Sequence, residues 1–407
     1  MKNLYKLGLA GILCGALIGF TMPAFAQEEA APIAAPEEEG KIASFFKSVE
    51  VSGFIDTYYM YNFSKPDDQR GSTPTNVRDD HQGDWLDVRA FDRETNSFTL
   101  DNVEISVFKP STESDPIGFG FTTNYGEIAQ RITFVPSDGR VDDDDFTVSQ
   151  GFVTYKAPVG KGIDFKFGKF ATWIGAELWE SVDNPNFSRS LLYQNAIPFT
   201  HTGLVVSYPL LDNLTATGYL VNGWDTFVDN NDAKTVGYQF NWAIGENTSF
   251  IVNGSHGAEQ DEDLVDNADG NIRHFWDLIL ALKPLANTSI NLNFDYGTEE
   301  GAEGIGGGFY ASPTGRNGQW WGFAGIINQD LSDAVGVAFR GEYFDDKDGA
   351  RLGVDELDIW EITGTVNIKI RENLLVRPEI RYDEANQEVF AGQDNELTTA
   401  ISVAYMF

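Results

Sequence analysis

The stretch "NELTTAISVAYMF", residues 395–407, ends the chain on an aromatic residue and decides the fold. Its odd positions hold Ile401, Val403, Tyr405 and Phe407, whereas the even positions from 398 to 404 hold the small or polar residues Thr398, Ala400, Ser402 and Ala404. A period of two is that of a β-strand, whose side chains alternate between two faces. The sequence therefore predicts a final strand with one apolar face, and something must cover that face.

The same alternation recurs from residue 49 onward. In 288–297, for example, Leu292 and Phe294 alternate with Asn293 and Asp295. A soluble sandwich of this size would need two unusually large cores, whereas in a transmembrane barrel lipid covers the apolar face and water wets the polar one. Short connections also alternate with longer, acidic ones, as in outer-membrane barrels. The predicted strands are 49–63, 96–109, 117–126, 146–157, 163–172, 200–209, 214–226, 234–244, 248–258, 272–283, 288–297, 318–328, 333–344, 355–370, 373–384 and 396–407.

We therefore expect an all-β fold, an antiparallel transmembrane β-barrel of about sixteen strands with short periplasmic turns and long acidic outer loops. The last strand should close the ring against 49–63, so that no strand edge stays open. Phe407 would then lie at the periplasmic interface with its ring toward lipid. The ending also resembles the C-terminal signature of bacterial outer-membrane proteins, which implies that the barrel-assembly machinery reads Tyr405 and Phe407.

The first residues predict export. Two lysines, Lys2 and Lys6, precede the apolar run 7–20, and Ala24-Phe25-Ala26 has the small residues of a cleavage site. We expect a signal peptide over 1–26, a periplasmic leader rich in Ala, Pro and Glu over 27–48, and the barrel over 49–407. The single cysteine, Cys14, lies in the predicted signal peptide.

Composition narrows the class further. The chain has 28 basic and 62 acidic residues, a formal net charge of −34, which argues against nucleic acid as a partner. Its aromatic content of 13% is high, although its mean hydropathy is only −0.26. A membrane barrel reconciles the two values, because half of each strand faces lipid and half faces water.

Four stretches together resemble a known family: "VSGFIDTYYMYNF" (51–63), "RAFDRETNSFTLDNVEISVFK" (89–109), "QGFVTYKAPVGKGIDFKFGKF" (150–170) and "NFSRSLLYQNAIPFTHTGLVVSYPL" (186–210). They look like the OmpL-like outer-membrane β-barrel porins, with the best resemblance over 49–225. The resemblance implies the fold and a location in the cell outer membrane, with outer-membrane lipid and lipopolysaccharide as surroundings. A homotrimer is a further expectation, since trimers are common among general porins.

In porins of known architecture, as the resemblance implies, the loop after the fifth strand folds inward. Here that loop is 173–199; the alternative is an outer loop lying over the mouth. The candidate constriction residues are Trp173, Glu177, Trp179, Glu180, Asp183 and Arg189. The polar faces of the strands supply candidate pore-lining residues, which could also be ion pairs that merely hold a water-filled wall. These are Asp56, Glu104, Asp277, Asp295, Arg340, Glu342, Glu361, Lys369, Arg377, Glu379 and Arg381.

The sequence contains few features that indicate catalysis. The sequence has no H-E-x-x-H and no G-x-S-x-G motif, and Ser255 and His256 are strand neighbours that should face opposite ways. We predict no catalytic residue, no metal site and no cofactor; 265–276 lacks the first and last carboxylates of a calcium loop. The predicted function is passive diffusion of small hydrophilic solutes with a lean toward cations. A structural or adhesive barrel with an occluded lumen and an outer-membrane hydrolase are the alternatives.

Overall fold

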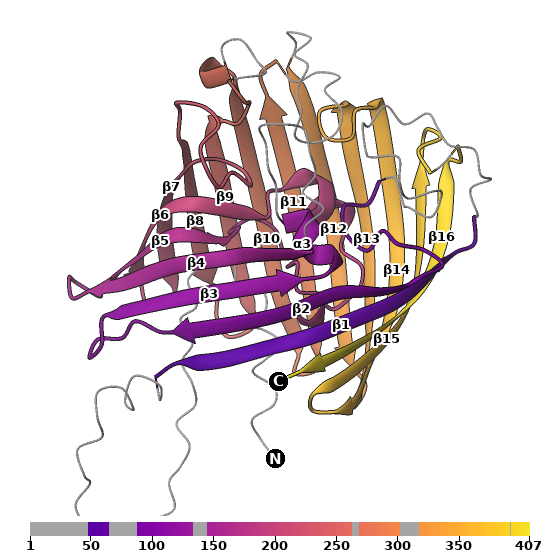
Figure 1. Ribbon diagram of the computed structural model, residues 1–407, viewed down its shortest axis with the longest axis horizontal. Helices are drawn as coiled ribbons and strands as arrows, with labels where there is room; N and C mark the ends of the chain where they lie inside the picture. The colour runs from indigo at the N-terminus through magenta and orange to yellow at the C-terminus, as the bar shows by residue number, and fades with distance from the viewer. Residues whose placement is uncertain (1–47, 65–87, 133–144, 263–267, 302–316, 391) are drawn as a thin grey trace, which may run out of the picture.

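The computed structural model describes residues 48–64, 88–132, 145–262, 268–301, 317–390 and 392–407. The fold is a closed antiparallel barrel in which each strand pairs with its sequence neighbours and β1 pairs with β16 (Figure 1). The strands are β1 (Glu50–Asn62), β2 (Phe98–Lys109), β3 (Ile117–Tyr125), β4 (Phe146–Ala157), β5 (Ile163–Ala171), β6 (Thr200–Leu211), β7 (Leu214–Val221), β8 (Thr235–Ala243), β9 (Thr248–Ala258), β10 (Ile272–Leu285), β11 (Thr288–Glu299), β12 (Gly318–Asp330), β13 (Val335–Asp348), β14 (Asp355–Arg371), β15 (Leu374–Ala385) and β16 (Asn395–Met406).

Every predicted strand is present, so the predicted fold class is confirmed. The ends differ by a few residues. The largest shortening is in β7, which ends at Val221 rather than 226, because Asp225 has a positive φ of 55° and leaves the sheet. Its carboxylate accepts the backbone N–H groups of Phe199 and Thr200, both at 2.7 Å, which fixes the bend. The predicted signal peptide and most of the predicted leader lie outside the described residues.

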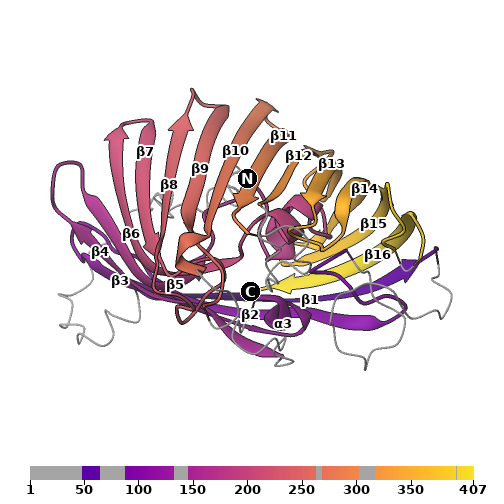
Figure 2. The ribbon, with the colours of Figure 1, turned by 90° about the horizontal axis from the view of Figure 1, so that it is seen from above.

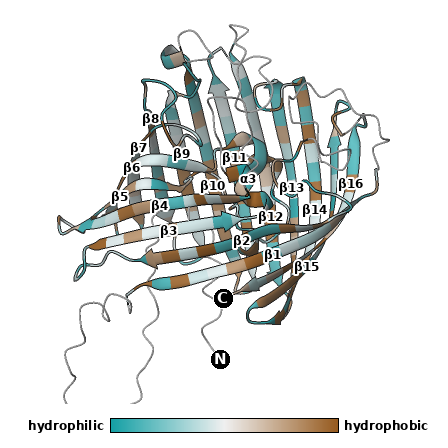
Figure 3. Ribbon diagram, viewed as in Figure 1, coloured by the Kyte–Doolittle hydropathy of each residue, from teal (hydrophilic) through white to brown (hydrophobic). Residues whose placement is uncertain are grey.

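The two faces of the strands differ as the alternation predicts. In β16, Ile401, Val403 and Tyr405 point outward and are exposed, whereas the inward Ser402 and Ala404 are fully buried. Figure 3 shows apolar and polar bands alternating along the strands. These apolar residues of β16 therefore lie on the outside of the ring, where lipid must cover them.

The end of the chain is fixed by its pairing with β1. The backbone N–H of Gly53 donates to Phe407 O at 3.0 Å, and that of Phe407 donates to Gly53 O at 2.9 Å. A Cβ atom on Gly53 would lie 2.7 Å from Cζ of the Phe407 ring, so glycine makes room for this ring on the outer face. Phe407 is 57% exposed there. Pairing of the last strand with the first is confirmed, while the periplasmic side of this end stays a prediction.

Several elements lie inside or beside the ring rather than in it. They are α3 (Glu127–Ile132), the short helices η1 (Ser181–Asp183) and η2 (Leu192–Ala196), and η3 (Ala268–Gly270). Seen from above, the chain between β5 and β6 crosses the inside of the barrel (Figure 2). In the parts of the chain that the structure describes, none of the helices combines the length and apolar character required to cross a membrane.

Candidate functional site

The connection between β5 and β6, residues 172–199, lies within the barrel, and we call it the inner segment. It is irregular apart from η1 and η2, and its Asn184-Pro185 step interrupts any longer helix. A buried backbone N–H without a partner costs about 1–3 kcal/mol, so such a chain needs acceptors from its surroundings. The inward faces of the strands supply them.

Carboxylates of the wall accept backbone N–H groups of the inner segment. Glu379 on β15 accepts from Phe187 at 2.7 Å and from Ser188 at 3.1 Å. Glu342 on β13 accepts from Leu191 at 2.5 Å and from Leu192 at 3.1 Å. Asp277 on β10 accepts the backbone N–H of Gly175 at 2.8 Å. Three separate strands therefore fix the path of the segment through its backbone.

Arginines of the wall bind both backbone carbonyls and acids. Arg340 on β13 donates to Ser188 O at 2.5 Å, to Glu177 of the segment at 3.0 Å and to Glu361 on β14 at 2.6 Å. All three of these charged groups are buried. Such a cluster is costly to desolvate and is tolerated only because each charge is paired and hydrogen-bonded.

A second arginine, Arg377 on β15, binds the η1 turn. It donates to Ser181 O at 2.5 Å and to Asp56 of β1 at 3.0 Å, while the Ser181 hydroxyl donates to the same Asp56. The first and the fifteenth strands are thus joined to the inner segment at one point.

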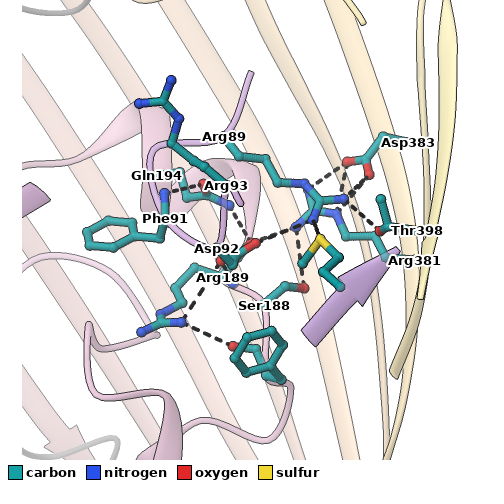
Figure 4. A network of polar contacts seen from close by, with 12 residues as sticks. Arg89, Phe91, Asp92, Arg93, Ser188, Arg189, Gln194, Arg381, Asp383 and Thr398 are labelled. Carbon is teal, nitrogen blue, oxygen red and sulfur yellow. Dashed lines mark hydrogen bonds and ion pairs between the residues drawn. The ribbon is translucent and has the colours of Figure 1, made fainter. Parts of the chain in front are cut away.

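A network of polar contacts connects the inner segment with a second inward stretch, residues 88–95 (Figure 4). Arg89 and Arg381 both bind Asp383, at 2.9 and 2.6 Å, and Arg381 also donates to Arg189 O at 2.7 Å. Asp92 accepts the backbone N–H of Arg189 at 3.2 Å. Burial raises the pKa of Asp92 to about 6, although Arg89 and Arg189 favour its charged form.

Apolar side chains pack the inner segment on its other side. Trp173 stacks on Tyr219 of β7 with ring centroids 3.8 Å apart. Leu192 fills the space over Gly322 of β12, where a Cβ atom would come within 2.7 Å of Leu192 Cδ1. Beyond it, Trp320 joins the same buried apolar cluster. The barrel therefore encloses a hydrophobic core, although its strands turn polar residues inward.

Two acids of the inner segment remain accessible. Asp183 is exposed and Glu180 is half-buried, in contrast to Glu177, which Arg340 holds in a buried pair. Burial, followed by the nearby Glu104 and Asp183 carboxylates, raises the pKa of Glu180 well above its usual range. Of the candidate constriction residues, Trp173, Trp179 and Arg189 are also buried.

Most candidate pore-lining residues are covered. Ten of them point inward and are at most 7% exposed: Asp56, Glu104, Asp277, Asp295, Arg340, Glu342, Glu361, Arg377, Glu379 and Arg381. Lys369, near the end of β14, is exposed. Protein atoms cover the ten charged groups, several of which hydrogen-bond to the inner segment.

Several residues of this site gave no signal of their own in the sequence. Arg89, Asp92 and Gln194 stand in long connections, where charged and amide side chains are ordinarily solvated. Gln194 accepts the backbone N–H groups of Ala90 and Phe91, at 2.7 and 3.0 Å, and so joins the two inward stretches. Phe91 and Phe199 are more hydrophobic than residues of a solvated outer loop usually are, and this could have indicated that both connections enter the barrel. Both side chains are buried.

Within the described residues, no histidine forms a hydrogen-bonded pair with a serine. Ser255 points inward and accepts a hydrogen bond from the Trp224 indole at 3.2 Å, whereas His256 lies on the outer face beside His274. His201 is fully buried between Thr172 and Gly223 O, at 3.1 and 2.9 Å. His81 lies outside the described residues.

One exposed group of acids, Asp232, Glu262 and Asp269, brings its oxygens within 4.8 Å of one another at the end of the barrel with the longer connections. Exposed acidic groups of this kind are common without an ion, and this group carries no metal assignment here. The rejected calcium-like stretch 265–276 is partly outside the described residues.

Known structures share this architecture. An anion-selective porin from Comamonas acidovorans aligns with a TM-score of 0.57 and 9% identity, over 88% of this chain and 99% of that chain. OmpF of Salmonella typhi in complex with daunomycin aligns with a TM-score of 0.57 and 12% identity, over 88% of this chain and 97% of that chain. OmpT of Vibrio cholerae in its trimer form aligns with a TM-score of 0.54 and 12% identity, over 88% of this chain and 99% of that chain. At such low identity, the likeness shows a common fold and no more.

Sequence comparison is more specific. Curated proteins yield no match to the chain. A family model described as "Putative beta-barrel porin-2, OmpL-like" matches residues 48–407, which extends the resemblance noted for 49–225 over the whole barrel. The chain therefore belongs to this OmpL-like family of outer-membrane β-barrel porins.

Proposed function

We propose that the protein is a passive diffusion channel for small hydrophilic solutes, with a preference for cations, and that the inner segment narrows its lumen. Membership of a porin family supports the channel. The observation that carries the constriction is the fixed path of the inner segment, held by backbone hydrogen bonds to Glu342, Glu379 and Asp277. A loop fixed in this way keeps a constant shape while solutes pass.

The preference for cations rests on which charges are accessible. The arginines of the wall are neutralised in buried pairs with Asp56, Glu361 and Asp383. Asp183 and Glu180 are the accessible acids of the inner segment. In a confined lumen an uncompensated carboxylate raises the local concentration of cations.

The buried residues first considered as pore lining would act on permeation indirectly. Arg340, Arg377 and Arg381 hold backbone carbonyls of the inner segment. We propose that they determine the width of the channel by positioning this segment, and that neutralising them would disturb the barrel interior before it altered selectivity.

The direct test is single-channel recording in a planar lipid bilayer, with the reversal potential measured across a salt gradient. Regular open steps with a reversal potential on the cation side support the proposal. Open steps with an anion-side or zero potential would remove the cation preference, and a silent but correctly folded protein would remove the channel.

The occluded structural barrel remains the second candidate, because a specific observation favours it. Leu192, Tyr193 and Trp320 belong to a buried apolar cluster inside the ring, and such a cluster excludes water from its share of the lumen. Silence in the bilayer, together with binding of the outer connections to a partner surface, would favour this candidate.

We infer a non-enzymatic role. The only adjacent serine and histidine considered, Ser255 and His256, lie on opposite faces of β9. Release of fatty acid from outer-membrane lipid by the purified protein would overturn this inference.

The remaining expectations concern assembly. We propose cleavage of the signal peptide after Ala26, recognition of Tyr405 and Phe407 by the barrel-assembly machinery, lipopolysaccharide around the outer rim and a homotrimeric state. Removal of Phe407 should lower the amount of folded barrel in the outer membrane, and light scattering in detergent should give the mass of three chains.

A further inference from the structure

Two histidines face each other on the outer surface of the barrel. His256 of β9 and His274 of β10 are direct partners across adjacent strands. Their neighbours Ser255 and Phe275 are buried on the inner face, so the two imidazoles point outward. Both are partly exposed.

The two rings are arranged as a pair of metal ligands would be. Nδ1 of His256 and Nδ1 of His274 are 3.0 Å apart, with ring centroids at 5.2 Å and an interplanar angle of 53°. Two imidazole nitrogens that bind one ion at about 2.0–2.1 Å lie roughly 2.8–3.4 Å apart, for ligand–metal–ligand angles between about 90° and the tetrahedral value. The observed separation falls in that interval, so one ion could bind both nitrogens without a shift in strand register.

Aromatic side chains hold the rings in place. Trp276 lies 5.3 Å from the His256 ring and 6.0 Å from the His274 ring, and Tyr238 of β8 lies 5.9 Å from His256 on the other side. Rings that are already oriented lose little rotamer freedom when they bind an ion, which favours binding.

The pair is also within reach of water. His256 is two residues before the end of β9 and His274 is two residues after the start of β10, at the end of the barrel with the longer connections. Solvent or another donor can therefore complete the coordination sphere, which two histidines alone do not fill.

From this geometry we propose that His256 and His274 form a surface site for a divalent transition-metal ion. Imidazole nitrogen suits Cu²⁺, Ni²⁺ and Zn²⁺, whereas Ca²⁺ and Mg²⁺ prefer oxygen ligands. Without metal, one imidazole N–H donates to the other ring. On binding, this proton moves to Nε2 of the same ring, so both Nδ1 atoms offer a lone pair and no net proton is released.

The test uses the full-length, untagged protein in detergent micelles, titrated with Cu²⁺. Electron paramagnetic resonance counts the nitrogen ligands and calorimetry gives the affinity, so that weak binding to the many carboxylates is distinguished. The wild-type chain should bind one tight ion with two nitrogen ligands. His256→Gln and His274→Gln should each weaken binding by at least about tenfold, since losing a ligand costs no less than losing an outer-sphere partner.

His81→Gln is the matched control, because it removes a histidine that is not one of the two proposed ligands; its affinity should equal that of the wild type. Cu²⁺ should also raise the unfolding temperature of the wild type and not of the two pair variants, because the ion binds the paired strands. Equal affinity in the wild type and in a folded pair variant, or a single-nitrogen spectrum in the wild type, would overturn the proposal. Neither outcome depends on whether the barrel conducts.

Discussion

The two sides of the inner segment are held in different ways. Toward β13–β16 and β1 the contacts are polar, from Arg340, Arg377 and Glu379 to backbone groups. Toward β7 and β12 they are mostly apolar, as where Trp173 stacks on Tyr219, although the Trp320 indole also donates to Ala196 O at 3.1 Å. Hydrogen bonds are directional and specify where the backbone lies, whereas apolar burial supplies free energy without specifying register. We infer that the polar side positions the constriction and the apolar side holds it there.

Deleting residues 176–190 removes the polar contacts made through Glu177, Ser181 and Ser188 and should have the largest effect. With the segment gone, the widened lumen should give a severalfold rise in single-channel conductance. A deletion of equal length in the predicted leader, 27–41, is the control and should leave conductance unchanged. If the shortened barrel folds and conducts as the wild type does, the inner segment does not narrow the channel.

Arg340→Met breaks the polar side alone. It leaves the buried Glu177 without its cation and removes from Glu361 the nearer of two cations, the other being Arg381 at 3.8 Å. Losing one member of a buried ion pair costs about 3–5 kcal/mol. Urea unfolding in lipid vesicles measures this free energy. Arg371→Met, at an exposed arginine at the end of β14, should stay within about 0.5 kcal/mol. Equal stability of the two variants would show that the polar contacts contribute little.

Gly322→Ala introduces a steric clash on the apolar side of the inner segment. The added methyl would meet Leu192 Cδ1 and the Tyr343 carbonyl oxygen, both at 2.7 Å, so we expect a destabilisation of about 1–3 kcal/mol. Gly218→Ala on β7 is the matched control, because a Cβ atom there meets nothing within 4 Å. A neutral Gly322→Ala would mean that Leu192 packs loosely against the wall.

The smallest effect concerns selectivity. Asp183→Asn should reduce the cation preference at neutral pH, because Asp183 is exposed. The pKa of Glu180 is raised well above its usual range, and burial raises that of Asp183 as well. Both acids are therefore more fully protonated than ordinary carboxylic acids at a given pH and gain charge as the pH rises. The cation preference of the wild type should therefore grow with increasing pH, and Glu180→Gln should flatten this dependence. Reversal potentials at several pH values measure this preference. A cation preference that stays constant or falls as the pH rises would contradict the prediction.

The outer face of the barrel could be predicted from sequence because a period of two is a local property. Residues such as Ile401, Val403 and Tyr405 indicate their shared face by spacing alone. The limits of the strands were less certain, as at β7, because the contact of Asp225 with Phe199 and Thr200 depends on a separate loop.

The interior could be predicted only in part. Resemblance pointed to the connection after the fifth strand, and the polar faces pointed to Arg340 and Arg377. Their partners in the inner segment, Glu177 and Ser181, lie more than 160 residues away along the chain. No spacing rule links such positions. The apolar cluster was missed for the same reason, since Trp173 and Leu192 stand in a connection without periodicity.

The central claim is that the accessible part of the inner segment borders the path of a permeating ion. The chain's single cysteine, Cys14, lies in the predicted signal peptide, so Asp183→Cys gives the mature protein one thiol. Reaction with a bulky charged thiol reagent during single-channel recording should lower the current in discrete steps. Asp212→Cys, in the β6–β7 turn where the side chain is 99% exposed, should react without a change in current. Complete labelling of Asp183→Cys, verified by mass, with an unchanged current would contradict the account.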